Sequence, residues 1–488
     1  MKKFLAFIVV AVAMLAVPSV RAHEPVAHHP LVRSNIELLE AWIESQMAYK
    51  AIPGMCLAIV HDQDIVYMHA FGYADIEAER KTAPETLYRI ASHSKLFTAI
   101  SIMQLRDAGK LDLDDSVEKY LPWFKLSGKD TVGPPVSIRH LLTHSSGVPR
   151  DAGLPYWIDF KFPTTEEIIQ RLPGQKTVFP TETEWKYSNL AFTLLGEVVA
   201  AVSGQPYEDY VSENIFQPLG MSNSGVTLSS IDITQLAKGY GRRLPDGSRQ
   251  EMPVVDAKGM AAAAGITSSV VDMARFVSWQ FRTLDDKDDE VLKPSTLREM
   301  QRIQWLDPKW TAGWGLAFHL RKTEDRLLVG HSGGYPGFKT STYCSPDEKI
   351  GVIVFSNSLD AQPYPGEPLS VVDRAFEWVG DAIAKSKDDL KPMTPEATWK
   401  PLSGTYRNIW SDIQVLGLDG ALVALDITNP NPKSTVSKLE PIEKSETTFR
   451  VMEGNPFFSL GDIVSFTLGE DGKAVRMMIG DFSFSRVE

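Results

Sequence analysis

The sequence predicts an α/β protein: an antiparallel sheet flanked by helices, with an all-helical insertion, followed by a small antiparallel β-barrel. Three observations support this fold class. Strand patterns open and close the first part of the chain, at residues 55–71 and 327–356, and helical patterns fill the region between them. After residue 398, short strands with little helical signal follow. We therefore expect a large domain at 23–386, a linker at 387–398 and a barrel domain at 399–488.

The composition is that of a folded globular protein with an ample core. Of the 488 residues, 43% are hydrophobic and 23% are charged. The 62 acidic residues outnumber the 50 Lys and Arg, which gives a net charge of −12. A basic footprint for nucleic acid is therefore absent, and binding to an anionic membrane surface is disfavoured.

Residues 1–22 have the pattern of a secretory signal peptide. Lys2 and Lys3 form a positive start, and Phe4–Val17 is apolar but too short to span a bilayer comfortably. A Val-x-Ala site predicts cleavage after Ala22; an uncleaved membrane anchor is the alternative. No later run is apolar and long enough to span a membrane. We therefore expect a periplasmic or secreted protein with no stable membrane span once the signal is removed.

Export would permit a disulfide, and the chain has two cysteines, Cys56 and Cys344. Both fall in strand-like segments of the same predicted sheet. The strand predicted at Ile350–Phe355 would lie between them and hold them too far apart to bond. We expect two buried, reduced thiols. No cluster of Cys and His has the spacing of zinc ligands.

The first elements of the large domain are a helix and a hairpin. The polar segment at 23–30 contains three histidines, and a frayed terminus is favoured there over a metal site. Helical periodicity marks Asn35–Met47, and two strands follow at Met55–Val60 and Ile65–Phe71. This hairpin leads into the stretch on which the functional argument rests.

A helix is predicted from Ser92 to Asp107, and its first turn brings together a serine and a lysine. Positions three apart share one face of a helix, so Ser92 Oγ and the Lys95 amine can converge. Unpaired backbone N–H groups and the helix dipole favour negative charge in that turn. A serine beside an amine whose pKa is lowered by burial is an activated nucleophile. The structural alternative is a capping serine before a solvated lysine.

Helical patterns fill the middle of the chain. A short helix at 116–124 should stop before Pro122, and a helix with a Ser/Gly turn covers 136–147. His144 stands beside two serines there. We favour a structural loop over a Ser–His pair, because no nucleophile elbow surrounds these serines. The run at Ala261–Gly265 suggests a close-packed strand before a helix.

Two further segments carry candidate site residues. Tyr187 and Asn189 stand just before a strongly helical run. Tyr187 offers a phenol, and Asn189 an amide that both donates and accepts hydrogen bonds. A packed tyrosine and a helix cap are the structural alternative. His331, Gly333 and Gly334 follow an apolar run that predicts a strand.

The rest of the chain predicts the end of the large domain and the barrel. Strands at 339–344 and 350–356 and an amphipathic helix at 370–385 precede the charged linker. Asp-Gly hairpins at 419–420 and 471–472 then mark an antiparallel domain with no obvious catalytic group. Its predicted strands are 402–406, 413–418, 421–427, 447–452, 463–468 and 474–479.

Three motifs occur in order, each on a suitable element: Ser92-x-x-Lys95, Tyr187-x-Asn189 and His331-x-Gly333. With them, the chain resembles the serine β-lactamase and penicillin-binding protein superfamily. The resemblance covers about residues 31–386. It is strongest to the branch of class C β-lactamases, DD-peptidases, D-aminopeptidases and family VIII esterases. The segment after 399 resembles, more weakly, the lipocalin-like domain that accompanies some of these hydrolases.

The resemblance implies a catalytic group. Ser92 resembles the nucleophile that becomes acylated, and Lys95 the amine that helps to deprotonate it. Tyr187 resembles the proton shuttle that acts first as base for Ser92, and Asn189 the residue that orients Lys95 and binds the carbonyl side of the substrate. A serine hydroxyl needs such an adjacent base at neutral pH. Lys and Tyr have reference pKa values near 10, so proximity and desolvation must shift them.

The same resemblance implies a binding strand. The backbone N–H groups of Ser92 and Gly334 resemble an oxyanion hole, and His331 and Gly333 resemble the strand that lines the substrate. Small residues at Gly333 and Gly334 would let the substrate approach closely. Many β-lactamases have Lys-Thr-Gly where this chain has His331-Ser332-Gly333. Loss of a fixed cation should weaken recognition of a substrate carboxylate, which lowers the expectation of an efficient β-lactamase without excluding a peptidase.

The sequence therefore predicts an exported serine hydrolase that cleaves ester or D-amino-acid-type amide bonds through a Ser92 acyl-enzyme, with no metal or organic cofactor. Small ester, amide or peptide molecules are the expected partners, and the oligomeric state is left open. The alternatives are a β-lactamase and a non-catalytic module that binds cell-wall peptide. A haem or lipid carrier built on the barrel has no ligand-specific residues behind it.

Overall fold

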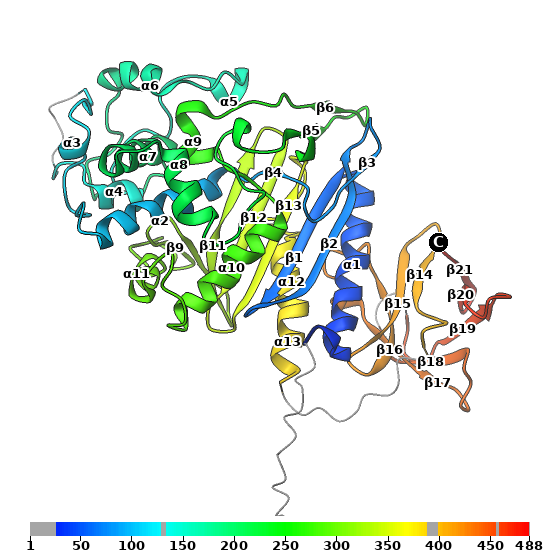
Figure 1. Ribbon diagram of the computed structural model, residues 1–488. Helices are drawn as coiled ribbons and strands as arrows, with labels where there is room; N and C mark the ends of the chain where they lie inside the picture. Colours follow the sequence, from blue (N-terminus) through cyan, green and yellow to red (C-terminus); the bar gives the residue numbers. More distant parts are fainter. Residues whose placement is uncertain (1–25, 128–132, 388–398, 455–457, 488) are drawn as a thin grey trace, which may run out of the picture.

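The computed structural model describes residues 26–127, 133–387, 399–454 and 458–487. The predicted signal peptide and all of the predicted linker except Lys387 lie outside the described residues. The described chain forms a nine-stranded antiparallel sheet with helices on both faces, and a closed antiparallel barrel (Figure 1). The predicted fold class is therefore confirmed.

The central sheet joins the two ends of the large domain, because the N-terminal hairpin pairs with the last strand of that domain. From one edge to the other, the order is β3 (Arg80–Lys81), β2 (Asp64–Asp75), β1 (Gly54–His61), β13 (Ile350–Ser356), β12 (Phe338–Ser345), β11 (Leu327–Tyr335), β10 (His319–Lys322), β9 (Ala312–Trp314) and β8 (Trp305–Leu306). Strands β8 to β10 have no counterpart in the sequence prediction.

Strand β1 is buried along nearly its whole length, because both faces of the sheet are covered. Cys56 and Ala58 belong to a hydrophobic core on one face, whereas Leu57 and Ile59 belong to a core on the other. Successive side chains of a strand point to opposite faces, so a continuous apolar run is what a doubly covered strand requires.

The two cysteines lie on strands that flank β13. Cys56 on β1 is opposite Phe355, and Cys344 on β12 is opposite Gly351, so β13 separates them. Both thiols are buried and free. The predicted reduced state is therefore confirmed, and burial raises the pKa of each thiol to about 12.

Helices that cover one face of the sheet, together with the helical insertion, lie on the left in Figure 1. The insertion also holds two short ladders, β4 (Tyr88–Arg89) with β7 (Thr267–Ser268) and β5 (Tyr240–Arg243) with β6 (Arg249–Glu251). The helices are α2 (Ser94–Asp107), α3 (Val117–Tyr120), α4 (Ile138–Leu142), α5 (Tyr156–Asp159), α6 (Thr165–Arg171), α7 (Asn189–Ser203), α8 (Tyr207–Val211), α9 (Ala261–Ala264), α10 (Val270–Leu284) and α11 (Pro294–Met300).

The strand predicted at Ala261–Gly265 is wrong: its alanines form helix α9. Alanine has the highest helix propensity, and no larger side chain was present to favour a strand. The close packing itself is real. A Cβ added to Gly196 of α7 would lie 2.5 Å from the Ala262 Cβ, so the two helices meet at their smallest residues.

Another group of helices covers the opposite face of the sheet. These are α1 (Pro30–Lys50), α12 (Val371–Ala375) and α13 (Asp381–Lys385), the last two joined by the π-helical turn η8 (Phe376–Gly380). Helix α1 starts earlier than predicted. Pro30 is its first residue, and His29 Nδ1 accepts a hydrogen bond from the Leu31 N–H at 3.2 Å. His29 therefore caps a helix, whereas the sequence favoured a frayed terminus.

The C-terminal barrel is an antiparallel meander closed by pairing of its first and last strands. The sequence prediction missed β17 and β21, in which polar or charged residues separate the few apolar ones. The strands are β14 (Gly404–Arg407), β15 (Asp412–Leu418), β16 (Ala421–Asp426), β17 (Ser437–Pro441), β18 (Thr448–Glu453), β19 (Ile463–Leu468), β20 (Ala474–Ile479) and β21 (Phe482–Arg486).

The barrel packs on the large domain through the outer face of β15 and β16. Leu422 and Ala424 point into the barrel core, whereas Val423 and Leu425 join the core formed by α1 and η8. Figure 1 shows the barrel beside α1, on the right. The barrel thus lies on the side of the sheet opposite to α2, the helix that follows Ser92.

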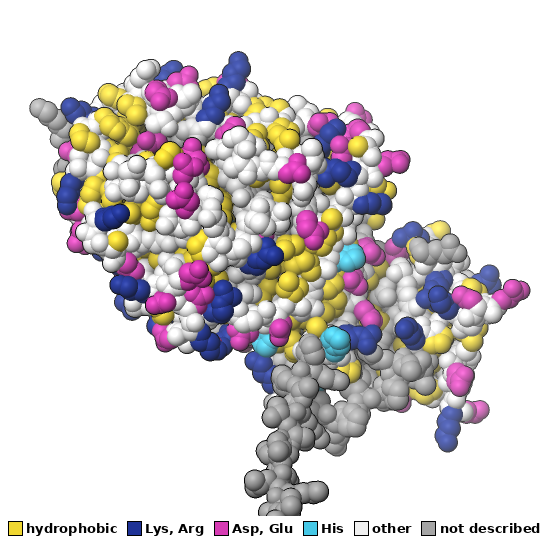
Figure 2. All heavy atoms as spheres, viewed as in Figure 1, with side chains coloured by type: hydrophobic (Ala, Val, Ile, Leu, Met, Phe, Trp, Pro, Cys, Tyr) yellow, Lys and Arg dark blue, Asp and Glu magenta, His cyan; other side chains and the backbone are white. Residues whose placement is uncertain are grey.

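The surface carries charges of both signs. On the face shown in Figure 2, acidic and basic side chains are interspersed over the large domain and the barrel. Within the described ranges, no helix has the length and apolar character needed to cross a membrane.

Candidate active site

Ser92 lies in a 3₁₀ turn, η2 (Ala91–His93), where the chain passes from β4 into α2. Ala91, directly before it, has a φ of +50°, a left-handed conformation that is uncommon for a residue with a side chain. The chain therefore turns sharply at the serine. This turn leaves Ser92 partly exposed, while Lys95 one turn later is fully buried.

Ser92 Oγ is contacted by two titratable groups. The Lys95 Nζ lies 3.1 Å from it, and the Tyr187 hydroxyl donates a hydrogen bond to it at 2.8 Å. Lys95 Nζ also donates to Asn189 Oδ1 at 2.9 Å and to the Ala263 carbonyl at 2.8 Å. The structure thus brings together Ser92, Lys95, Tyr187 and Asn189, which the sequence predicted as one group.

The two titratable groups are shifted in opposite directions. Desolvation, and to a lesser degree the positive charge of Arg150, hold the pKa of Lys95 well below its usual range. Desolvation raises the pKa of Tyr187, although its hydrogen bond to Ser92 opposes the shift. The resting site therefore favours a neutral amine and a protonated phenol.

A neutral Lys95 fits the contacts around its nitrogen. An amine has two N–H donors and one lone pair. Asn189 Oδ1 and the Ala263 carbonyl can only accept, so they take the two donors. The lone pair then faces Ser92 Oγ, which has a proton to give. Lys95 is thereby oriented as a proton acceptor for the serine.

Asn189 is oriented by a carboxylate that sequence reasoning missed. Asn189 opens α7 behind an N-cap, Ser188, whose Oγ accepts from the Ala191 N–H at 2.9 Å. Its Nδ2 donates to Asp151 Oδ1 at 2.9 Å, which fixes the amide with Oδ1 toward Lys95. Asp151 lies in a loop that contains Gly and Pro, and its sequence context does not distinguish it from an ordinary solvent-exposed aspartate.

The His331 motif lies on β11, which packs against η2. His331 is 6% exposed, and its Nδ1 lies 2.6 Å from the Ser332 carbonyl. Desolvation lowers its pKa well below the usual value, so the ring is neutral. A neutral His331 ring agrees with the expectation that this motif carries no fixed positive charge where many β-lactamases have a lysine.

Gly333 and Gly334 differ in their surroundings: Gly333 faces the protein backbone, whereas Gly334 is exposed. A Cβ on Gly333 would lie 2.2 Å from the Ile90 carbonyl oxygen, so this glycine lets β11 approach the turn that carries Ser92. A Cβ on Gly334 would meet only the Tyr364 hydroxyl, at 3.3 Å, and this residue is exposed. The expectation that both glycines make room for substrate is therefore corrected for Gly333.

His144 lies behind the tyrosine. Its ring centroid is 4.4 Å from that of Tyr187, and its Nδ1 accepts from the Ser188 N–H at 3.1 Å. Ser145 Oγ is paired with Thr143 Oγ1 at 2.8 Å. His144 therefore supports the Tyr187 segment, as a structural loop would, and Ser145 is engaged elsewhere.

An aromatic cleft of about 470 Å³ opens beside these residues. Trp185 and Trp314 stack on one another in its wall with ring centroids 3.8 Å apart. Of the described lining side chains, Arg150 alone carries a permanent charge, and it lies over the Tyr187 ring. The full lining is Arg150, Trp185, Tyr187, Trp314, His319, His331, Ser332, Gly333, Gly334, Tyr343, Tyr364 and Pro365.

The part of the chain that the structure describes contains no group of three or more His, Cys, Asp or Glu side chains arranged to hold a metal ion. The groups gathered at Ser92 are an amine, a phenol, an amide and a hydroxyl. This set suits proton transfer and nucleophilic attack at a carbonyl carbon.

Comparisons with known proteins agree with this arrangement. The family model described as Beta-lactamase matches residues 39–374. Penicillin-binding protein 4* of Bacillus subtilis (strain 168) is 30% identical over 441 residues, which cover 85% of this chain and 92% of that protein.

Solved structures give the same result. The octameric penicillin-binding protein homologue from Pyrococcus abyssi has a TM-score of 0.62 and 26% identity, covering 92% of this chain and 99% of that one. A D-stereospecific amidohydrolase from Streptomyces sp. shares the fold at 22% identity and a TM-score of 0.58, covering 71% of this chain and 99% of that one. The chain therefore belongs to the Beta-lactamase family, within the serine β-lactamase and penicillin-binding protein superfamily.

Proposed function

We propose that this protein is an exported serine hydrolase that cleaves ester or D-amino-acid-type amide bonds through an acyl-enzyme on Ser92. One observation carries the proposal: Ser92 Oγ contacts both a fully buried Lys95 and the Tyr187 hydroxyl. Membership of a family of hydrolases supports it. The proposed mechanism uses no metal ion and no organic cofactor.

Acylation begins with the attack of Ser92 Oγ on the substrate carbonyl carbon while its proton passes to the neutral Lys95 amine. The negative charge moves to the carbonyl oxygen, where the backbone N–H groups of Ser92 and Gly334 are proposed to stabilise it. When the intermediate collapses, the Tyr187 hydroxyl protonates the leaving alkoxide or amine. Lys95 then returns its proton to Tyr187, so the pair ends as it began.

Deacylation uses the same groups with water as the nucleophile. A water molecule attacks the Ser92 ester and loses its proton to the neutral Lys95 amine, and that proton passes to Ser92 Oγ as the acid product leaves. The opposite pKa shifts of Lys95 and Tyr187 support this division between an acceptor and a donor. The resemblance implied that Tyr187 acts first as base; in the resting geometry, the amine is the better acceptor.

The cleft favours apolar and aromatic substrates. Its wall is largely aromatic, and the neutral His331 offers no counter-charge to a carboxylate next to the reacting bond. Arg150, whose side chain is 61% exposed, stands at the edge instead. We therefore rank aryl esters and amides of apolar D-amino acids above β-lactams, whose carboxylate would go unpaired.

The test is hydrolysis by the purified protein of a nitrophenyl ester, a D-alanyl anilide and a chromogenic cephalosporin. Ser92→Ala should abolish turnover of every substrate, whereas Ser145→Ala, which alters the serine beside His144, should retain it. Equal turnover by Ser92→Ala and the wild type would contradict the proposal. The preferred substrate distinguishes esterase, peptidase and β-lactamase.

A wild-type protein that is acylated on Ser92 but never releases product would favour the non-catalytic binding module instead. Mass spectrometry after incubation with a penicillin measures that acyl adduct. For export, the mature protein in the periplasmic or culture fraction should begin at His23, as N-terminal sequencing would show; a chain that still begins at Met1 would contradict cleavage.

A further inference from the structure

The barrel contains a second cavity, on the other side of the central sheet from Ser92, which the proposed hydrolysis does not use. Its volume is about 290 Å³. The turn between β14 and β15 forms part of the wall, and strands β20 and β21 form another part. The lining side chains, all uncharged, are Asn408, Trp410, Ser411, Phe458, Ile479, Phe482 and Phe484.

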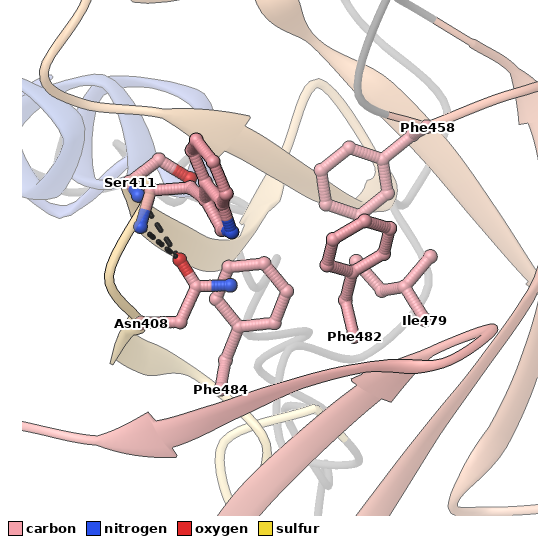
Figure 3. A pocket seen from close by; sticks show the side chains of 7 residues that line it. Asn408, Ser411, Phe458, Ile479, Phe482 and Phe484 are labelled. Carbon is pink, nitrogen blue, oxygen red and sulfur yellow. Dashed lines mark hydrogen bonds between the residues drawn. The ribbon is translucent and has the colours of Figure 1, made fainter.

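The cavity has a buried interior and an exposed aromatic edge. Phe458, Ile479 and Phe484 belong to the barrel core and are at most 5% exposed. Trp410 and Phe482 are 70% and 58% exposed. Figure 3 shows Phe484 on one side of the space and Phe458, Ile479 and Phe482 on the other. Two large rings in water at the mouth of an apolar cavity form a concave apolar surface, unlike single hydrophobic residues scattered over a surface.

A polar atom without a partner lies in this apolar wall. Asn408 Oδ1 accepts hydrogen bonds from the backbone N–H groups of Trp410 at 2.7 Å and Ser411 at 3.1 Å, which fixes the turn (Figure 3). Ser411 is 6% exposed, and its Oγ is buried with no hydrogen-bond partner among the described residues. A buried hydroxyl without a partner is destabilising, so this atom is suited to a polar group brought by a ligand.

We propose that the barrel binds one small, uncharged, one- or two-ring molecule with a single hydroxyl or carbonyl group. The rings occupy the space bordered by Trp410, Phe482 and Phe484, and the polar group hydrogen-bonds to Ser411 Oγ. This site goes beyond the proposed hydrolysis at Ser92.

Size and charge define the ligand class. An apolar protein cavity of about 150 Å³ holds one benzene molecule, so 290 Å³ suits a molecule of about twice that size. Transfer of an ion into an apolar site without a counter-charge is costly. Among the described residues, no lining side chain supplies such a charge, and anionic analogues should therefore bind poorly.

The experiment uses the full-length protein and the uncharged two-ring fluorophore 6-propionyl-2-dimethylaminonaphthalene, which carries a single carbonyl group, with displacement by 2-naphthol, naphthalene and 2-naphthoate. We expect one saturable site per chain, tighter binding of 2-naphthol than of naphthalene, and at least tenfold weaker binding of the 2-naphthoate anion. Absence of saturable binding, or equal binding of the anion and the alcohol, would overturn the proposal.

Matched variants locate the site. Trp410→Ala should weaken probe binding at least fivefold, whereas Trp310→Ala, which removes a 74% exposed tryptophan from the large domain, should change it less than twofold. Ser411→Ala should weaken 2-naphthol binding about fivefold and leave naphthalene unchanged. Trp185→Ala should have no effect.

Three results would contradict these expectations. Probe binding that is lost in Trp185→Ala would mean that the catalytic cleft, and not the barrel, holds the probe. Equal effects of Trp410→Ala and Trp310→Ala would mean that tryptophans on the surface hold it. An equal loss for 2-naphthol and naphthalene in Ser411→Ala would remove the assigned hydrogen bond. Circular dichroism of each variant verifies that the barrel is folded.

Discussion

At the scale of single residues, the central feature is a lysine with no exposed surface whose three hydrogen-bonding neighbours are oxygen atoms. Two of these neighbours can only accept, and the third is the Ser92 hydroxyl. Removal of Lys95 from water favours the neutral amine. The protein thereby holds an unprotonated base next to its nucleophile without a histidine.

The first prediction concerns pH. A lysine with a lowered pKa accepts a proton only above that pKa, so kcat/KM for a nitrophenyl ester should rise with pH through one ionisation well below 10.5. Lys95→Met, which keeps an unbranched side chain one atom shorter and removes the amine, should lower kcat/KM about 10³-fold. A pH profile of the wild type that stays flat as the pH is lowered would contradict the assignment.

The second prediction concerns Asp151, which also accepts hydrogen bonds from the Tyr156 hydroxyl at 2.6 Å and the Trp157 Nε1 at 3.2 Å. Asp151→Ala should free the Asn189 amide to rotate, misplace Lys95 and lower kcat about 100-fold. Asp151→Asn retains an accepting oxygen and should keep most of the activity.

Steady-state kinetics of both Asp151 variants tests this role, and circular dichroism verifies the fold. A loss in Asp151→Ala that appears only in KM would mean that Asp151 contacts the substrate and does not position Asn189.

Much of the catalytic group could be predicted from the sequence, because Ser92 and Lys95 are one helical turn apart and such local spacing fixes side-chain proximity. Asp151 could not, since it reaches Asn189 through a loop whose path no local pattern encodes. Trp185 and Trp314 likewise meet only after the helical insertion and the sheet have packed together.

At the scale of elements, the site depends on the contact between β11 and η2. The third prediction compares two neighbouring glycines in that contact. Gly333→Ala should cost about 1–3 kcal/mol of stability, because its Cβ would overlap the Ile90 carbonyl. It should also lower kcat/KM at least tenfold, because β11 must move away from Ser92. Gly334→Ala, with only the end of a tyrosine nearby, should change stability by less than about 0.5 kcal/mol.

Urea unfolding and ester hydrolysis measure both effects. Equal stability of the two variants would show that the contact between strand and turn is looser than the geometry indicates.

Regular elements with strong local signals were predicted well. The doubly covered strands, the helix after Ser92 and the amphipathic helix at 370–385 all have continuous or periodic apolar patterns. The short strands β8 to β10 and β17 lack such patterns, and their pairing partners, not their own residues, make them strands. Helix α9 shows the reverse case, in which alanines followed their own propensity.

At the scale of the whole molecule, the barrel and the large domain share one hydrophobic core. Trp42 of α1 and Trp378 of η8 pack edge to face at 5.6 Å, and Leu425 of β16 belongs to the same cluster. The sequence showed the barrel but not this docking, although the unbroken apolar pattern of β16 is what a strand covered on both sides requires.

The fourth prediction tests that shared core. Leu425→Asp would bury an unpaired carboxylate between the barrel and the large domain, so it should destabilise the protein by about 3 kcal/mol. Leu468→Asp, on a barrel strand but 44% exposed, should change stability by less than about 0.5 kcal/mol. Denaturant unfolding followed by tryptophan fluorescence compares them; similar midpoints would mean that the barrel is an independent unit.

The shared core also has a consequence for synthesis of the chain. A ribosome makes α1 early and makes β15 and β16, the barrel strands that pack on it, only after the whole large domain. Until these two strands have emerged, the face of α1 that they cover has no partner. A premature stop codon ahead of β15 would therefore leave Ser92, Lys95, Tyr187, Asn189 and His331 intact on a polypeptide with an uncovered apolar surface. A gene truncated there would still encode all three catalytic motifs, but its protein product would be prone to aggregation and degradation.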